Sequence, residues 1–326
     1  MAETALVLGA TGSFGGGLAR ELLRRGRPVR ALVRDLAKGR RALGEHPALT
    51  LARGDVLDPD AVAGAAEGCR VIVHGVNYPY DQWVPSMERA TANIIAAARA
   101  AGATILFPGN VYGLGPQTSA PLAEAAPNQP SSRKGALRVQ LEASLREATA
   151  DGRARVIVLR AGDYFGPTVR NGLVDPIFGN AARGKAIQAI GNLAIAHQWA
   201  FVPDLARAAA DLLALGEGLA PFDVVHFAGH LARPQRAFLR LVAAEAGRPE
   251  LGIRRIPMWT LRVVGLWNAV VRELWELRYL FEASVVLDGA KLRQLLPGYA
   301  DTPVGEAVRA TVASYREGGP SGPSPC

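Results

Sequence analysis

The chain of 326 residues has few cysteines to cross-link it and no long apolar segment to anchor it in a membrane. Its two cysteines, Cys69 and Cys326, have no second Cys or His at a ligand spacing, so the sequence predicts neither a disulfide framework nor a metal site. No long uncharged apolar run is present, which predicts no membrane span. No basic stretch precedes the first apolar run, so we expect no signal peptide and a cytoplasmic protein.

The charge is positive but dispersed. Lys and Arg number 37 against 29 acids, giving a net charge of +8. No basic tract is interleaved with aromatic residues, so the composition argues against nucleic-acid binding. An anionic small molecule, such as a phosphorylated cofactor, is the partner this charge favours, and a homodimer is left open.

Short apolar runs alternate with helical patterns through the first half of the chain. This order is typical of an α/β fold, a Rossmann-type doubly wound parallel sheet. The expected strands are 5–8, 29–33, 49–52, 71–73, 103–107 and 156–159, and the expected helices are 18–25, 60–66, 87–101 and 136–150.

The sequence pattern changes after Pro167, where helical patterns predominate. We expect a dinucleotide-binding domain over 1–166, to which segments near 195–230 return, and a smaller, mainly helical substrate domain over 167–317. The Gly/Pro/Ser-rich residues 318–326 predict a disordered tail.

Residues 258–281 form an unusual segment, with Trp259, Trp267 and Trp275 eight residues apart. Five charged residues make it too polar to span a membrane. Three interpretations stay open: a packed amphipathic helix or helix pair broken near Gly265, an apolar lid over a substrate, or a membrane-surface helix.

A glycine-rich turn opens the chain. Gly9, Gly12 and Gly15 give the pattern G-x-x-G-x-x-G directly after a strand and before a helix. Such a turn lets a pyrophosphate approach the backbone N–H groups of a helix N-terminus. The sequence therefore predicts a dinucleotide site that contains Gly9, Thr11, Gly12, Ser13, Phe14 and Gly15.

The end of the second strand distinguishes NAD from NADP. The strand runs into Arg34, whose guanidinium suits a 2′-phosphate. Asp35 follows at once and could bind a ribose hydroxyl instead. We expect NADP(H), with NAD(H) as the alternative.

With these motifs in place, the chain resembles the extended short-chain dehydrogenase/reductase family, the NAD-dependent epimerase/dehydratase group. The further marks are Gly54-Asp55-Val56, Val111-Tyr112-Gly113, Arg160 to Pro167 and Phe201 to Ala206. The resemblance implies that Asp55 and Val56 flank the adenine. It also implies that Gly75, Val76 and Asn77 touch the adjacent ribose and phosphates.

The resemblance fails at the catalytic residues. The family uses a Tyr and a Lys four positions apart on one helix, and matching that helix places Lys134 and Arg138 there. Pro108 stands at the family's Ser/Thr position. We expect Lys134 to bind the cofactor and give the proton, Arg138 to hold the ribose, and Asn110 to orient the substrate oxygen. Tyr164 is the rival proton donor.

Three residues are expected to meet the substrate: Asp163, Tyr112 and Trp267. Nucleotide-sugar enzymes of the family commonly carry Asn where Asp163 stands, and a carboxylate there would repel a sugar diphosphate. This favours a neutral, partly apolar substrate. His197 is interpreted as structural.

Three functions remain after these steps. The first is an NADP-dependent oxidoreductase acting on a carbonyl, an alcohol or an activated double bond. The second is an epimerase or dehydratase that uses the cofactor transiently. The third is a dinucleotide-binding sensor without catalysis, which the missing Tyr permits.

Overall fold

The computed structural model describes residues 3–79, 82–117, 121–267 and 269–318. Its centre is a seven-stranded sheet in the order β10-β6-β5-β4-β1-β2-β3, and every neighbouring pair is parallel. The strands of this sheet are β1 (Thr4–Leu8), β2 (Val29–Val33), β3 (Leu49–Arg53), β4 (Cys69–His74), β5 (Thr104–Gly109), β6 (Arg155–Ala161) and β10 (Phe222–Phe227). The doubly wound α/β prediction is confirmed.

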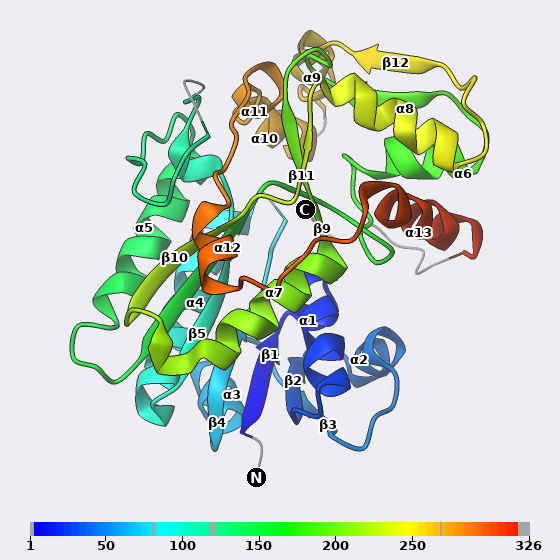
Figure 1. Ribbon diagram of the computed structural model, residues 1–326. Helices are drawn as coiled ribbons and strands as arrows, with labels where there is room; N and C mark the ends of the chain where they lie inside the picture. The colour runs from blue at the N-terminus through cyan, green and yellow to red at the C-terminus, as the bar shows by residue number, and fades with distance from the viewer. Residues whose placement is uncertain (1–2, 80–81, 118–120, 268, 319–326) are drawn as a thin grey trace.

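Both faces of this sheet are covered, because alternate residues of each strand point to opposite sides. In β1, Ala5 and Val7 join one buried cluster while Leu6 and Leu8 join another. The first cluster includes side chains of α1 (Ser13–Arg24), α2 (Leu36–Leu43), α7 (Val202–Leu215) and α12 (Ala290–Leu295). The second includes α3 (Pro59–Ala66), α4 (Trp83–Ala101) and α5 (Arg133–Glu147). Figure 1 shows α7 crossing in front of the strands beside α1.

A smaller region lies beyond the carboxyl ends of the strands (Figure 1). A three-stranded sheet, β11-β9-β7, and a two-stranded sheet, β12-β8, pack there with helices around a third core that contains Phe165, Trp199 and Phe238. Its elements are β7 (Asp163–Phe165), β8 (Ile187–Ile190), β9 (His197–Phe201), β11 (His230–Ala232), β12 (Ile253–Ile256), α6 (Asn180–Ala182), α8 (Gln235–Glu245) and α13 (Val304–Arg316). Short helical turns are η2 (Tyr112–Leu114), η3 (Asp175–Gly179) and η4 (Gly216–Gly218).

The tryptophan-rich segment folds as α9 (Met258–Val264), α10 (Ala269–Trp275) and α11 (Tyr279–Glu282). Gly265 ends α9, and a Cβ there would lie 2.9 Å from the Cα of Arg272, so only glycine allows the two helices to approach this closely. Met258, Leu261 and Phe281 are buried together beneath the helix pair. None of the helices in the described ranges is long and apolar enough to cross a membrane.

Some element boundaries differ from the expected ones. The first helix begins at Ser13 rather than at residue 18, and the strand expected over 103–107 is β5, which extends to Gly109. The boundary between domains at 166 and 167 stays a prediction. Of the tail expected over 318–326, all but Gly318 lies outside the described residues.

Candidate active site

The glycine turn between β1 and α1 is held so tightly that side chains are excluded. Gly9 has a φ of +74°, and a Cβ there would stand 2.1 Å from the carbonyl oxygen of Gly75. A Cβ on Gly15 would stand 2.4 Å from the Gly9 carbonyl oxygen. Gly12 caps α1 without a side chain, and the first turn of the helix contains no acid. Its N–H groups and positive helix end therefore fit a pyrophosphate.

The turn lies where the sheet order reverses. β1 pairs with β2 on one side and β4 on the other, which makes a crevice outside the carboxyl ends of these strands. Gly75 and Val76 follow β4 directly and line that crevice. Asn77 lies beside them, and its Oδ1 accepts a hydrogen bond of 2.7 Å from the Trp83 indole.

The charges of two of the expected adenosine residues, Asp55 and Arg34, act on Tyr78. Burial raises the pKa of the Tyr78 hydroxyl, the Asp55 charge raises it further, and the Arg34 charge opposes them, so both charges act on one phenol. Arg34 itself is exposed at the end of β2. Asp35 is occupied locally, because its Oδ1 accepts a bond of 3.0 Å from the Lys38 backbone and caps α2. Val56 is buried nearby in the second core.

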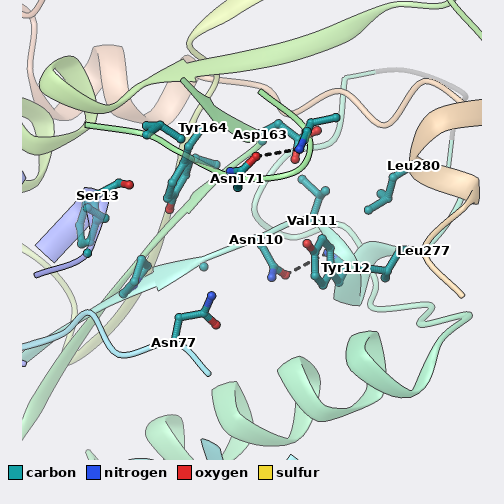
Figure 2. A pocket seen from close by; sticks show the side chains of 18 of the residues that line it. Ser13, Asn77, Asn110, Val111, Tyr112, Asp163, Tyr164, Asn171, Leu277 and Leu280 are labelled. Atoms are coloured by element: carbon teal, nitrogen blue, oxygen red, sulfur yellow. Dashed lines mark hydrogen bonds between the residues drawn. The ribbon is translucent and has the colours of Figure 1, made fainter. Parts of the chain in front are cut away.

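A cavity of about 310 Å³ opens onto the glycine turn (Figure 2). One end is lined by the turn and by the residues after β4, and the other end by polar and apolar side chains from several elements. Among the residues expected from the sequence, the cavity is lined by Gly12, Ser13, Phe14, Gly75, Val76, Asn77, Asn110, Tyr112, Arg138, Asp163 and Tyr164.

The helix α5 brings Arg138 to this cavity but not Lys134. Lys134 is 2% exposed, and its Nζ lies 3.2 Å from Oε1 of Glu276 in the segment after α10. The backbone N–H of Lys134 donates to the same oxygen at 3.0 Å. Burial raises the pKa of Glu276, but the hydrogen bonds and charge of Lys134 outweigh it and the pKa is lowered. The ion pair thus joins α5 to the tryptophan-rich segment.

Arg138 is packed between aromatic rings at the cavity wall. Its guanidinium carbon lies 4.9 Å from the ring centre of Trp83 and 5.1 Å from that of Phe107. Its Nη1 donates to the Pro108 carbonyl at 3.2 Å. Such contacts fix a cation in place and present its remaining N–H groups in a set direction.

The sequence-predicted polar residues at the end of β5 face the same space (Figure 2). Asn110 accepts a hydrogen bond of 3.1 Å from the Tyr112 backbone through Oδ1, so it shapes the turn while lining the cavity. Tyr164, from β7, lies across from them. Burial raises the pKa of Tyr164 to about 12, and the charge of Arg138 opposes this only in part. The phenol therefore stays protonated and is a weak acid.

Asp163 is paired rather than isolated. Its Oδ2 lies 2.8 Å from Nε2 of His197 on β9, and the carboxylate still lines the cavity. His197 is 8% exposed and packs on Trp199. The histidine therefore orients the carboxylate that was expected to meet substrate.

The tryptophan-rich segment forms an apolar roof, made by Leu274, Leu277, Leu280 and Phe281. Tyr279 fastens the roof by donating to the Tyr112 carbonyl at 3.0 Å, as the ion pair of Glu276 does at α5. Trp267 does not take part: 81% of it is exposed, and it lies outside the cavity lining.

Sequence reasoning missed several residues of the wall, namely Trp83, Arg170, Asn171, Leu173, Ile190, Leu277 and Leu280. Arg170 is held by the carbonyls of Pro167 and Val169 and by Ser314, and Asn171 caps the next turn through Oδ1. These residues carry no motif. Leu277 lies in the turn between α10 and α11 and Leu280 lies in α11, so no single helical periodicity links them.

A profile of the NAD dependent epimerase/dehydratase family matches residues 5–226, about two thirds of the chain. The chain belongs to this family. The match runs from the second residue of β1 to the next-to-last residue of β10, so it covers nearly all of the central sheet and ends before the tryptophan-rich segment.

Solved structures agree with the family fold. The Bordetella bronchiseptica enzyme WbmH in complex with NAD+ is 21% identical, with a TM-score of 0.75 over 97% of this chain and 99% of that one. DesIV, a dTDP-glucose 4,6-dehydratase from Streptomyces venezuelae, is 20% identical, with a TM-score of 0.77 over 96% and 97%. At these identities the likeness is one of fold.

A curated relative, 3-diazoavenalumate denitrifying reductase of a Streptomyces species, is 32% identical over 177 residues. The match covers 50% of this chain and 56% of the relative, so the chain spans just over half the length of that protein.

Proposed function

We propose that this member of the epimerase/dehydratase family is an NADP(H)-dependent reductase of a small, partly apolar substrate. The observation that carries the proposal is a single cavity whose one end is the glycine turn and whose other end is a roof of leucines. A substrate under that roof would lie against the cofactor bound at the glycine turn.

The cofactor would supply a hydride, and this chain's residues would bind and orient it. Gly12 and the first turn of α1 suit the pyrophosphate, while Asp55 and Val56 suit the adenine. Arg34 suits the 2′-phosphate, since Asp35 beside it is already bonded to a backbone N–H. Arg138, aimed into the cavity from α5, would take the ribose hydroxyls at the nicotinamide end.

The size of the cavity limits the substrate. Ligand pockets typically measure about 300–1,000 Å³, and this one, at about 310 Å³, must be shared with the nicotinamide end of the cofactor. The space left over suits a small substrate better than a nucleoside diphosphate sugar. The apolar roof and the Trp83–Tyr112 ring pair, with centres 6.1 Å apart, suit a single ring compound.

The groups around the cavity favour an acceptor that needs a hydride more than a proton. Lys134, at the family's Tyr position, is bound to Glu276, and Tyr164 is a weak acid. Reduction of a carbonyl consumes a hydride and a proton. Replacement of a diazonium group consumes a hydride alone: the hydride pair forms the new C–H bond, and the C–N pair leaves with N₂.

This preference agrees with the relative that is named a denitrifying reductase of a diazo compound. We therefore extend the proposed acceptors from carbonyls and activated double bonds to aryl diazonium compounds. Asn110 and the Asp163–His197 pair would orient the acceptor, and the Asp163 carboxylate would favour a positively charged reacting group.

The test is a single-turnover reaction with NADPH deuterated at the transferred position. The proposal expects stoichiometric NADPH oxidation and deuterium in the product, with an aryl diazonium compound or a carbonyl compound as acceptor. An epimerase or dehydratase would regenerate the cofactor, so product without net NADPH loss would support that alternative, which the family match favours. Tight binding without turnover of any acceptor would support a sensor.

A further inference from the structure

Exposed apolar side chains gather on one short stretch of the molecule. Large hydrophobic residues more than about a third exposed number eight in the described part of the chain, and five of them fall within residues 259–267. We call these five the tryptophan patch: Trp259, Val263, Val264, Leu266 and Trp267. Scattered exposed apolar residues need no explanation, but a contiguous group marks an interaction site.

The packing of α9 and the chain reversal at Gly265 leave this patch facing outward. Met258 and Leu261 turn inward from α9 and are buried with Phe281, which lines the cavity. The close approach at Gly265 reverses the chain, so Trp267 follows at the tip between α9 and α10. It is 81% exposed, and Trp259 is 64% exposed. The patch is thus the outer surface of the element that roofs the cavity, at the end of the molecule farthest from the N-terminus (Figure 1).

The sequence of the patch and its flanks is basic over residues 251–272. Between Glu250 and Glu273 the sequence contains four arginines and no acid. These arginines, all exposed, are Arg254, Arg255, Arg262 and Arg272. Arg254 also borders a recess of about 630 Å³ that Arg183 and Lys185 line, with Asp175 as its acidic neighbour. Asp175 is engaged by the Tyr315 hydroxyl at 2.5 Å.

We propose that the tryptophan patch docks the protein on the surface of an anionic lipid bilayer. Tryptophan favours the boundary between headgroups and acyl chains, and arginine beside it pairs with lipid phosphates. A hairpin of two seven-residue helices inserts shallowly and does not cross. The inference is independent of the proposed reaction. Its consequence for the cavity is that the roof would rest on the membrane, where apolar molecules concentrate.

The experiment is flotation of the full-length protein with vesicles. Vesicles of phosphatidylcholine alone are compared with vesicles that also contain 30 mol% (about a third) phosphatidylglycerol. We expect binding to the anionic vesicles, weakened at high salt, together with a blue shift of tryptophan emission as Trp259 and Trp267 leave water.

Two double variants separate the apolar and the charged contributions. Trp259→Ser with Trp267→Ser should weaken vesicle binding about 100-fold, the effect of losing two large buried side chains. Arg262→Gln with Arg272→Gln should weaken it about 30-fold and only for anionic vesicles. Leu231→Ser, 41% exposed elsewhere, is the matched control and should bind as the parent does. Melting temperatures should change by no more than about 2 °C, because the substituted side chains are exposed.

The alternative occupant is a second copy of this chain. If the parent protein ignores anionic vesicles, the proposal is overturned. If light scattering then shows a dimer that the tryptophan variant dissociates, the patch is a self-association surface instead. Equal vesicle binding by the parent and by both double variants would also overturn the assignment.

Discussion

Arg34→Ala is the substitution that tests the cofactor assignment most directly. Arg34 is exposed at the end of β2, its charge acts on Tyr78 together with that of Asp55, and nothing in its position suggests a role in the core. The variant should therefore fold as the parent does and differ only in what it binds. We expect it to lose its preference for NADPH over NADH.

The magnitude follows from the exposure of the side chain. A hydrogen bond to a charged group contributes about 1.5–3 kcal/mol, and solvent screening places an exposed arginine at the lower end. A loss of about 1.5 kcal/mol corresponds to about tenfold weaker NADPH binding. NADH has no 2′-phosphate, so its affinity should change less than about twofold. High salt should shrink the NADPH effect, since the contact is exposed.

The assay is titration of NADPH and NADH by calorimetry against parent and variants. Arg24→Ala is the matched control: Arg24 is an exposed arginine at the far end of α1, about 16 Å along the helix from the glycine turn. Asp35→Ala probes the competing assignment, because weaker NADH binding in that variant would mean that Asp35 holds a ribose hydroxyl. Tighter binding of NADH than NADPH by the parent would refute the reasoning, as would an equal loss of both cofactors in Arg34→Ala.

Three further substitution experiments test the site. Lys134→Met should raise KM, because it removes the ion pair with Glu276 that holds the roof, and should leave kcat unchanged. A fall in kcat of about 10²–10⁴-fold, with Tyr164→Phe still active, would instead make Lys134 the proton donor. Leu277→Ala should lower stability by about 2–5 kcal/mol and raise KM, whereas Trp267→Ala should change neither in a melt or a rate assay. Burial, aided by the Arg138 charge, lowers the pKa of His74 to about 3, so the unfolded chain alone takes up that proton below pH 6.5. His74 alone should lower the unfolding free energy by about 1.4 kcal/mol per pH unit from pH 6 toward 3, and His74→Gln should reduce the measured slope by about that amount in denaturant titrations.

The sheet and the glycine turn could be predicted because their signals are local. Apolar runs at the right spacing and a glycine pattern are properties of neighbouring residues. The start of α1 was missed because Gly15, Gly16 and Gly17 argue against a helix by propensity. Their helical state is imposed by packing: a Cβ on Gly16 would lie 2.8 Å from the Ala10 carbonyl oxygen, and one on Gly17 would lie 3.1 Å from Val202.

The site was predicted only in part, because many of its contacts join residues far apart in the sequence, and such contacts produce no local sequence pattern. Glu276 binds Lys134 across 142 positions, and this pairing keeps a lysine at the family's Tyr position out of the cavity wall. Trp267 was expected to meet the substrate because tryptophans and other apolar residues recur along the segment. Composition does not tell which side of a helix pair faces inward, and here the leucines of the second half line the cavity.

The order of strands in the central sheet also affects how the chain folds during its synthesis. β6 is paired on one side by β5, and its other side is covered by β10, which begins 61 residues after β6 ends, at Phe222. A ribosome adding about 5–20 residues per second therefore leaves the outer edge of β6 open for several seconds. An open edge of apolar strand pairs readily with other chains. Expression at low temperature with abundant chaperones should accordingly raise the yield of folded protein more than any change to the finished surface would.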